Sequence, residues 1–161
     1  HYILFMNIRF TLTIIGIFFL ISISKTHANP TGKSVSCHSS LKENLNYKNY
    51  KGISFETERS VRVVTLKMKN NKLKVVSKLT PYKIKKNNIY FKIKFIWYGN
   101  IFFEEFNLNR DNLDLINTSK NQVIQLKCKV INGDFMAEMN RSKDKYQGIF
   151  QQGVGEKINS F

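Results

Sequence analysis

Beyond the first 28 residues, apolar and polar side chains alternate along much of the chain, and short turn sequences interrupt the alternation at close spacing. A period of two is typical of strands with one buried and one solvated face, and no helical period runs through this part of the chain. The turn sequences are Asn70-Asn71, Asn87-Asn88, Gly99-Asn100 and Asn132-Gly133. We therefore expect an all-β fold, an antiparallel β-meander of about 7–8 strands that closes into a small barrel or a sandwich.

Each two-residue turn also predicts a register, because the strands that flank it pair outward from the turn. The first turn sets Leu66 opposite Val75, and the second sets Ile84 opposite Phe91. Asparagine tolerates the positive φ that such turns require. In both hairpins the paired apolar side chains share one face, as a buried sheet face requires.

The stretch "IYFKIKFIWYGNIFFEEF", residues 89–106, reads as a hairpin with one buried face and one wet face. Folding at Gly99-Asn100 pairs Ile93 with Phe106 in the core and Lys94 with Glu105 outside. The same register points Glu104 toward the core side. Either a bulge turns this carboxylate outward, or it contacts a partly wet cavity, where it needs a cation or a donor nearby.

The end of this hairpin is apolar on both faces. Ile96, Tyr98, Ile101 and Phe103 lie on the face that the lysines mark as wet. Such a strand end is either covered by another segment, for which the N-terminal segment is the candidate, or contacts a partner. In the second case these residues form an interaction patch suited to a lipid surface or a protein partner.

The pattern divides the chain into four parts. Residues 1–28 hold a signal peptide after a few upstream residues, and residues 29–52 form a polar N-terminal segment. The β-meander domain spans 53–140 and includes a last hairpin at Asn132-Gly133, with Val130 opposite Phe135. Residues 141–161 are expected to form a polar C-terminal tail with at most one edge strand.

Residues 6–28, "MNIRFTLTIIGIFFLISISKTHA", carry the three-part pattern of a secretory signal. Arg9 precedes an uncharged stretch, and small residues precede Asn29. The uncharged stretch is shorter than the roughly 20 residues that span a bilayer as a helix. We expect cleavage before Asn29 and an exported protein, periplasmic or secreted, with a retained N-terminal anchor as the alternative.

Two cysteines, Cys37 and Cys128, are the only pair in the chain. Disulfides persist in the oxidising compartments that exported proteins reach, so we expect these two to be bonded, with two free thiols as the alternative. His38 is the only histidine after the signal, and no four-ligand set accompanies it. We therefore expect no metal site and no cofactor, and we interpret His38 as an exposed loop residue.

The formal net charge is +15, which falls to about +13 when Arg9 and Lys25 leave with the signal. Ten lysines and no acid lie between residues 67 and 94, and Lys67, Lys74, Lys92 and Lys94 represent this basic face. It is either a solvated face or a binder of polyanions or membrane surfaces. Nucleic acid is an improbable partner, because the aromatic residues of the alternation face the core and export removes such polymers.

No residue pattern marks a catalytic centre. Neither a nucleophile with an oriented base nor a pair of facing carboxylates is evident, so we expect no catalytic residues. We expect a non-enzymatic binding or interaction module of the cell envelope, whose partner is an apolar ligand, an envelope protein or an anionic surface. The alternative is a small secreted enzyme with an unrecognised carboxylate site.

Two late segments, "FNLNRDNLDLI" and "IQLKCKVINGDF", carry a resemblance. Behind a signal peptide and an earlier cysteine, they resemble small exported β-meander proteins of AT-rich marine bacteria, over roughly residues 89–135. The "LNR" of those proteins is often followed by a glycine, where this chain departs from the pattern. The resemblance implies a compact β-barrel in the envelope, and it implies no activity or catalytic residue.

Overall fold

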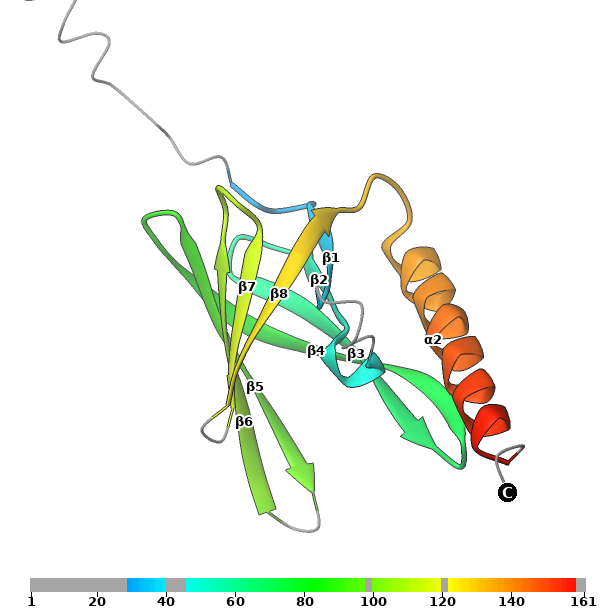
Figure 1. Ribbon diagram of the computed structural model, residues 1–161. Helices are drawn as coiled ribbons and strands as arrows, with labels where there is room; N and C mark the ends of the chain where they lie inside the picture. Colours follow the sequence, from blue (N-terminus) through cyan, green and yellow to red (C-terminus); the bar gives the residue numbers. More distant parts are fainter. Residues whose placement is uncertain (1–28, 40–45, 98–99, 120–121, 159–161) are drawn as a thin grey trace, which may run out of the picture.

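Eight antiparallel strands follow one another around a closed barrel in the computed structural model of the protein, which describes residues 29–39, 46–97, 100–119 and 122–158 (Figure 1). The strands are β1 (Ser34–His38), β2 (Lys51–Phe55), β3 (Ser60–Lys69), β4 (Lys72–Lys85), β5 (Asn88–Trp97), β6 (Asn100–Asn109), β7 (Asp114–Ser119) and β8 (Gln122–Val130). A short 3₁₀ helix, η2 (Tyr47–Asn49), precedes β2, and a helix, α2 (Phe135–Ile158), follows β8. The expected all-β meander is confirmed, and it closes as a barrel. The predicted signal peptide lies outside the described residues.

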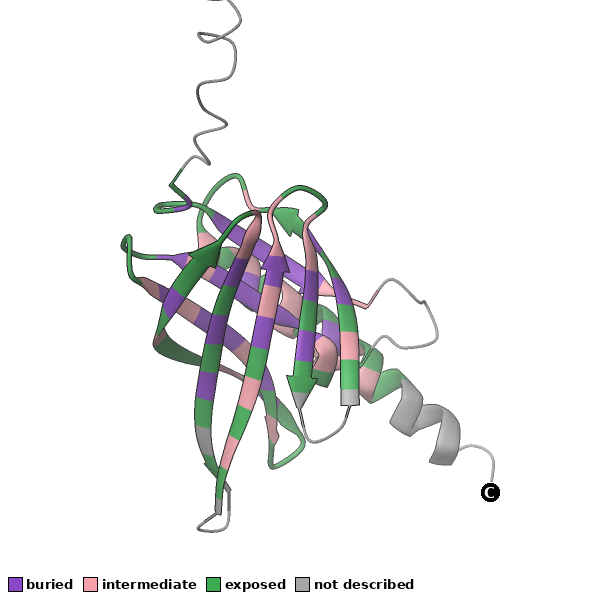
Figure 2. Ribbon diagram, turned by 90° about the vertical axis from the view of Figure 1, so that its left-hand side faces the viewer, coloured by how far each residue is buried: buried purple, intermediate pink, exposed green. Residues whose placement is uncertain are grey.

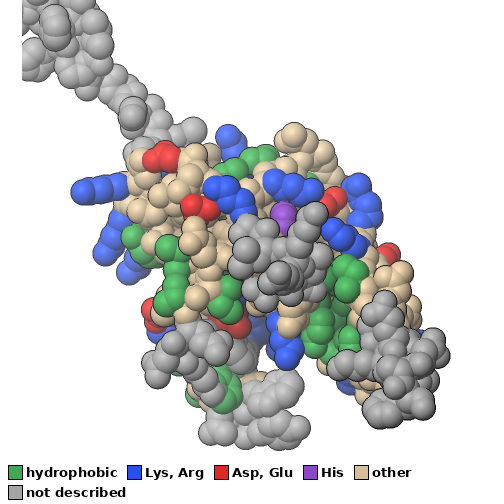
Figure 3. All heavy atoms as spheres, in the orientation of Figure 1, with side chains coloured by type: hydrophobic (Ala, Val, Ile, Leu, Met, Phe, Trp, Pro, Cys, Tyr) green, Lys and Arg blue, Asp and Glu red, His purple; other side chains and the backbone are tan. Residues whose placement is uncertain are grey.

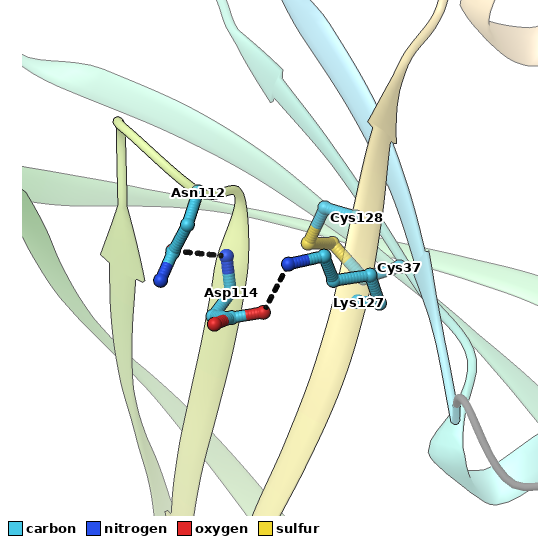
Figure 4. The surroundings of a disulfide bond; sticks show 5 residues. All are labelled: Cys37, Asn112, Asp114, Lys127 and Cys128. Carbon is cyan, nitrogen blue, oxygen red and sulfur yellow. Dashed lines mark hydrogen bonds and ion pairs between the residues drawn. A yellow bond between two sulfur atoms is a disulfide. The ribbon is translucent and has the colours of Figure 1, made fainter.

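The barrel closes at β1, which pairs with β2 along one side and with β8 along the other. Cys37 lies directly opposite Cys128 in the β1–β8 ladder, and the two cysteines form the predicted disulfide (Figure 4). The barrel therefore begins at Ser34 rather than at residue 53. The segment that we expected to be a polar N-terminal extension supplies the strand that completes it.

Inward-facing side chains from all eight strands fill most of the lumen. Along the strands they alternate with exposed residues (Figure 2). An eight-stranded barrel is just wide enough for such side chains to fill its interior or to leave room for one small ligand. The buried residues of this core are Val35, Cys37, Ile53, Phe55, Val61, Val63, Tyr82, Ile89, Phe91, Ile93, Phe106, Leu108, Leu115, Leu126 and Cys128.

A second core forms outside the barrel, where α2 packs on the outer face of the sheet. Met139 and Tyr146 of the helix are buried against Val64, Leu66 and Tyr50. Apolar side chains therefore occupy both faces of β3, which accounts for the nearly continuous burial of residues 63–66.

The predicted hairpin at Asn132-Gly133 is wrong, because the chain leaves the sheet after Val130 and enters α2. Asp134 caps the helix: its Oδ1 accepts from the backbone N–H of Ala137 at 3.0 Å, and its carbonyl accepts from that of Glu138 at 3.1 Å. A capping aspartate followed by apolar residues at helical spacing favours this outcome over a tight turn. Residues 141–158, expected to be a polar tail, continue the helix.

The first predicted turn is confirmed. Asn70 and Asn71 have φ of 51° and 58°, and Leu66 lies opposite Val75. The second turn lies one residue earlier than predicted, at Lys86-Asn87, where Lys86 has a φ of 54° and Asn88 already pairs with Lys85; Asn87 closes the turn. Its carbonyl accepts from the N–H of Arg110 at 2.8 Å. The pairing shifts by two residues, so every side chain stays on the face that was predicted for it. The alternation pattern therefore cannot distinguish the two registers.

The third turn shifts in the same way. Phe106 lies opposite Phe91 instead of Ile93, and their rings stack with centroids 5.0 Å apart. Lys92 comes opposite Glu105, and its Nζ lies 2.7 Å from Oε1 of that carboxylate. The observed register thus stacks Phe106 on Phe91 instead of Ile93, and it gives Glu105 the partner Lys92 in place of Lys94.

We predict that replacing both cysteines with alanine lowers the free energy of unfolding by about 4 to 5 kcal/mol, because the bond closes a loop of 91 residues in the unfolded chain. Urea denaturation of the oxidised protein and of the double variant measures the difference. Reduced wild type serves as the control and should match the variant. A loss below about 1 kcal/mol would contradict the loop-closure argument.

The outward face of β2 gives a second stability prediction. A Cβ atom at Gly52 would overlap the Met139 Sδ and lie 3.3 Å from Cε2 of Phe135. We expect Gly52→Ala to lower the free energy of unfolding by about 1–3 kcal/mol. Gly148→Ala is the matched control: Gly148 lies within α2 with open space around it, so this change should stabilise by about 0.5–1 kcal/mol. Equal effects of the two substitutions would show that α2 does not pack closely on β2.

Candidate binding site

A cavity of about 510 Å³ opens at the end of the lumen where the β3–β4 and β5–β6 hairpins diverge (Figure 1). Its walls come from η2 and from strands β2 to β6. Two register pairs, Val63 with Lys78 and Ile93 with Glu104, set apolar and charged side chains side by side in these walls. The lining residues are Tyr47, Lys48, Lys51, Val63, Thr65, Leu66, Lys67, Met68, Val76, Lys78, Ile93 and Glu104.

Side-chain hydrogen bonds close part of the barrel wall between β4 and β5, beside the cavity. The backbone pairs between β4 and β5 end at Phe91, although both strands continue past that point. There Thr80 Oγ1 donates to the carbonyl of Lys92 at 2.7 Å, and Lys78 Nζ donates to the carbonyl of Lys94. Side-chain bonds thus replace backbone bonds along this seam.

Lys51 is the most buried charged residue of the cavity, with 6% of its side chain exposed. Its ammonium group lies 3.4 Å from Oε2 of Glu104 and 3.4 Å from the carbonyl of Lys48, to which it donates. It also lies 6.0 Å from the centre of the Phe106 ring. A buried ammonium group is costly unless its donors are used, and both polar contacts are long. The ammonium group of Lys51 can therefore pair with a further anionic group.

Four lysines and one carboxylate line the cavity: Lys48, Lys51, Lys67, Lys78 and Glu104. Among the described lining residues, positive charge therefore exceeds negative charge by three. A confined site with one sign of charge concentrates ligands of the opposite sign. The arrangement is suited to a ligand that combines an apolar body with an anionic group.

The structure places Glu104 on the cavity wall beside a cation, which is the second of the two arrangements that the sequence left open. The β5–β6 pairing is continuous through this position, so no bulge turns the side chain outward. Its role as a ligand contact stays a prediction.

The lysines chosen to represent one basic face lie on two sides of the sheet. Lys67 and Lys74 are opposite each other on the lumen side of the β3–β4 hairpin, and Lys67 lines the cavity. Lys92 and Lys94 lie on the outer side of β5, where the ammonium group of Lys92 sits 4.4 Å from the centre of the Phe103 ring. The alternation of each strand separates the two pairs.

Three residues of the predicted interaction patch are exposed at the end of the β5–β6 hairpin. Ile96, Ile101 and Phe103 expose 65%, 52% and 46% of their surface. Tyr98 lies outside the described residues. Because these three side chains are exposed, no described part of the N-terminal segment covers them, and their use as an interaction patch stays a prediction.

Lys51 is the site residue that the sequence reasoning missed. It lies in the segment that we expected to be polar, yet it is on the same face of β2 as Ile53 and Phe55, which point into the core. Extending the period-two pattern back from Ile53 by two residues would have placed Lys51 on the lumen side.

In the part of the chain that the structure describes, no group of three or more His, Cys, Asp or Glu side chains gathers as a metal site would require. None of the helices in that same part combines the length and the apolar character that crossing a bilayer demands. Comparison with protein-family models, with curated proteins and with solved structures finds no match to this chain. The argument for function therefore depends on the residues of the cavity.

The exposure of the patch predicts a small effect on stability. We expect Ile96→Ser combined with Phe103→Ser to lower the free energy of unfolding by no more than about 1.5 kcal/mol, most of it from the lost cation–π contact with Lys92. Ile89→Ala on the same strand is the buried control, with an expected loss of about 2–5 kcal/mol. Urea denaturation compares them, and a double variant as unstable as the control would mean that the patch is covered.

Proposed function

We propose that the protein is a non-enzymatic binding module that holds a small amphiphile, with an apolar body and an anionic group, in the open end of its barrel. The observation that carries this proposal is the buried ammonium group of Lys51, which faces a cavity with an excess of lysines. The anionic group of the ligand pairs with Lys51, and the apolar body lies against the neighbouring aliphatic side chains.

The size and lining of the cavity support this function. Ligand sites are typically clefts of about 300–1,000 Å³ lined by apolar side chains with a few polar groups that orient the ligand. This cavity, at about 510 Å³, combines Val63, Val76, Ile93 and Met68 with the charged groups of Lys51 and its neighbours. A ligand of roughly the size of a two-ring aromatic acid or a medium-chain carboxylic acid fits that description.

Two alternatives are less well supported. Acid–base catalysis by paired carboxylates needs two such groups in one site. Of the described lining residues, Glu104 alone carries a carboxylate, and Lys51 engages it. Binding of a long polyanion needs a continuous basic track, whereas Lys67 and Lys74 lie on a different side of the sheet from Lys92 and Lys94.

We further propose that the module acts in the periplasm or outside the cell. The disulfide between Cys37 and Cys128 is consistent with an oxidising compartment. The signal pattern in residues 6–28 points to the same location.

Two fluorescent probes of similar shape test the ligand class: anilinonaphthalene sulfonate, which is anionic, and N-phenylnaphthylamine, which is neutral. We expect the anionic probe to bind one-to-one and more tightly than the neutral probe. Lys51→Met should lower the affinity for the anionic probe by about 10-fold or more, because a charge-assisted contact is lost. The same substitution should change the affinity for the neutral probe by less than about 2-fold. Fluorescence titration measures both affinities.

Lys83→Met is the matched control, since Lys83 is exposed on β4 and does not line the cavity. It should leave both affinities unchanged. The variant that combines Ile96→Ser with Phe103→Ser should also keep its affinity for both probes. This result would show that the probes bind in the cavity and not at the exposed patch. Equal binding of the two probes, or insensitivity of the anionic probe to Lys51→Met, would disprove the proposal.

A further inference from the structure

A second cavity, of about 390 Å³, lies outside the barrel between α2 and the β1–β8 junction. It shares no lining residue with the lumen cavity. Its walls include Ser36 and His38 of β1, Lys129 of β8, Arg141 and Lys145 of α2, and Tyr50. Figure 3 shows Lys and Arg side chains gathered around the histidine on this face.

Ser36 forms a buried part of the wall and has an unused hydroxyl group. The residue is 2% exposed, and its Oγ has no hydrogen-bond partner among the described residues. A buried hydroxyl without a partner costs about 1–3 kcal/mol. In the β1–β8 ladder Ser36 lies directly opposite Lys129, so both side chains leave the sheet on the same face and a few ångströms apart.

Hydrogen-bond donors far outnumber acceptors around this hydroxyl. Lys129, Arg141 and Lys145 are cationic, whereas Glu138 is the one acid among the described lining residues, and it lies 3.5 Å from Arg141 in an ion pair. The hydroxyl of Tyr50, whose pKa burial raises to about 12, donates to the Sδ of Met139 at 3.4 Å. A water molecule could satisfy Ser36 alone, whereas an anion would also pair with the exposed ammonium groups beside it.

The imidazole of His38 lies close enough to these cations for their positive charge to affect its pKa. Partial burial, and then the charges of Lys129 and Lys145, lower its pKa. The neutral ring still offers one N–H donor. His38 is half-buried at the end of β1 rather than in the exposed loop that the sequence suggested.

We propose that this cavity is an oxyanion site that takes a phosphate group, either as the free ion or as the head group of a phosphomonoester. The phosphate oxygens accept from Ser36 Oγ and from the ammonium groups of Lys129 and Lys145. Tetrahedral oxyanions are suited to such a set, because they present several acceptor oxygens to converging donors.

The disulfide holds the two walls of the site together. Cys37 separates Ser36 from His38, and its partner Cys128 precedes Lys129. The crosslink therefore fixes the spacing of the donors on β1 and β8. The outer site is independent of the ligand proposed for the lumen, so either can exist without the other.

Calorimetric titration of the oxidised protein with inorganic phosphate tests the proposal. We expect saturable one-to-one binding that Ser36→Ala and Lys145→Gln each weaken by about 10-fold. In phosphate-free buffer Ser36→Ala should fold with unchanged or higher stability, because it removes an unpaired buried hydroxyl. A loss of affinity in a variant that is at least as stable as wild type cannot result from misfolding.

Lys143→Gln is the matched control, because Lys143 lies on the same helix, pairs with Asp144 and does not line the cavity. A parallel titration uses vesicles of phosphatidic acid, with phosphatidylcholine vesicles as the blank. Binding of free phosphate identifies the ion as the ligand. Binding of phosphatidic acid alone, weakened by Ser36→Ala, identifies a lipid head group. Binding of neither, wild-type affinity in both site variants, or an equal loss in Lys143→Gln would overturn the proposal.

Discussion

The closure between β1 and β8 is the constraint on which the rest of the structure depends. A sheet that does not close leaves two edges with unpaired backbone groups, and β1, with only five residues, removes them by pairing with both β2 and β8. Its ladder with β8 has four residue pairs, and the Cys37–Cys128 bond reinforces it. Cys37 also lies opposite Lys51 in the β1–β2 ladder. One residue thus aligns the buried lysine of the lumen on one side and the donors of the outer cavity on the other.

The lumen itself is asymmetric, and this asymmetry creates the site. Most inward positions carry aliphatic or aromatic side chains that fill the barrel. At one end, Lys51, Thr65, Lys67 and Lys78 occupy inward positions instead. Long charged side chains cannot pack as densely as a hydrocarbon core, since each charge needs a polar partner or solvent. Space therefore remains where the lysines converge, and the space carries their charge.

Alternation and turn chemistry predicted the meander and the Asn70-Asn71 turn correctly, and they left open whether Glu104 faces the lumen. They could not resolve a shift of two residues at the next two turns, because such a shift leaves every side chain on its own face. After Val130 the chain forms a helix and not a strand, because Asp134 caps the helix and Met139 packs against Gly52 and Tyr50. Such tertiary contacts cannot be read from the sequence pattern. The strand "SVSCH" escaped notice because its outward positions are small serines that leave a weak alternation signal. Lys51, the central residue of the proposed lumen site, was missed for the same reason: its segment did not read as a strand.

Past Phe91, side-chain hydrogen bonds hold β4 to β5. Parting the strands there breaks the bonds that Thr80 and Lys78 donate to β5, whereas between Tyr82 and Lys85 it breaks backbone pairs. Lys78 also lines the lumen cavity, so an anion that attracts its ammonium group competes with the carbonyl of Lys94. The same side chain therefore holds the wall together and lines the cavity. Under the proposed function, the charge of the ligand and the strength of this part of the barrel wall are therefore linked through one side chain.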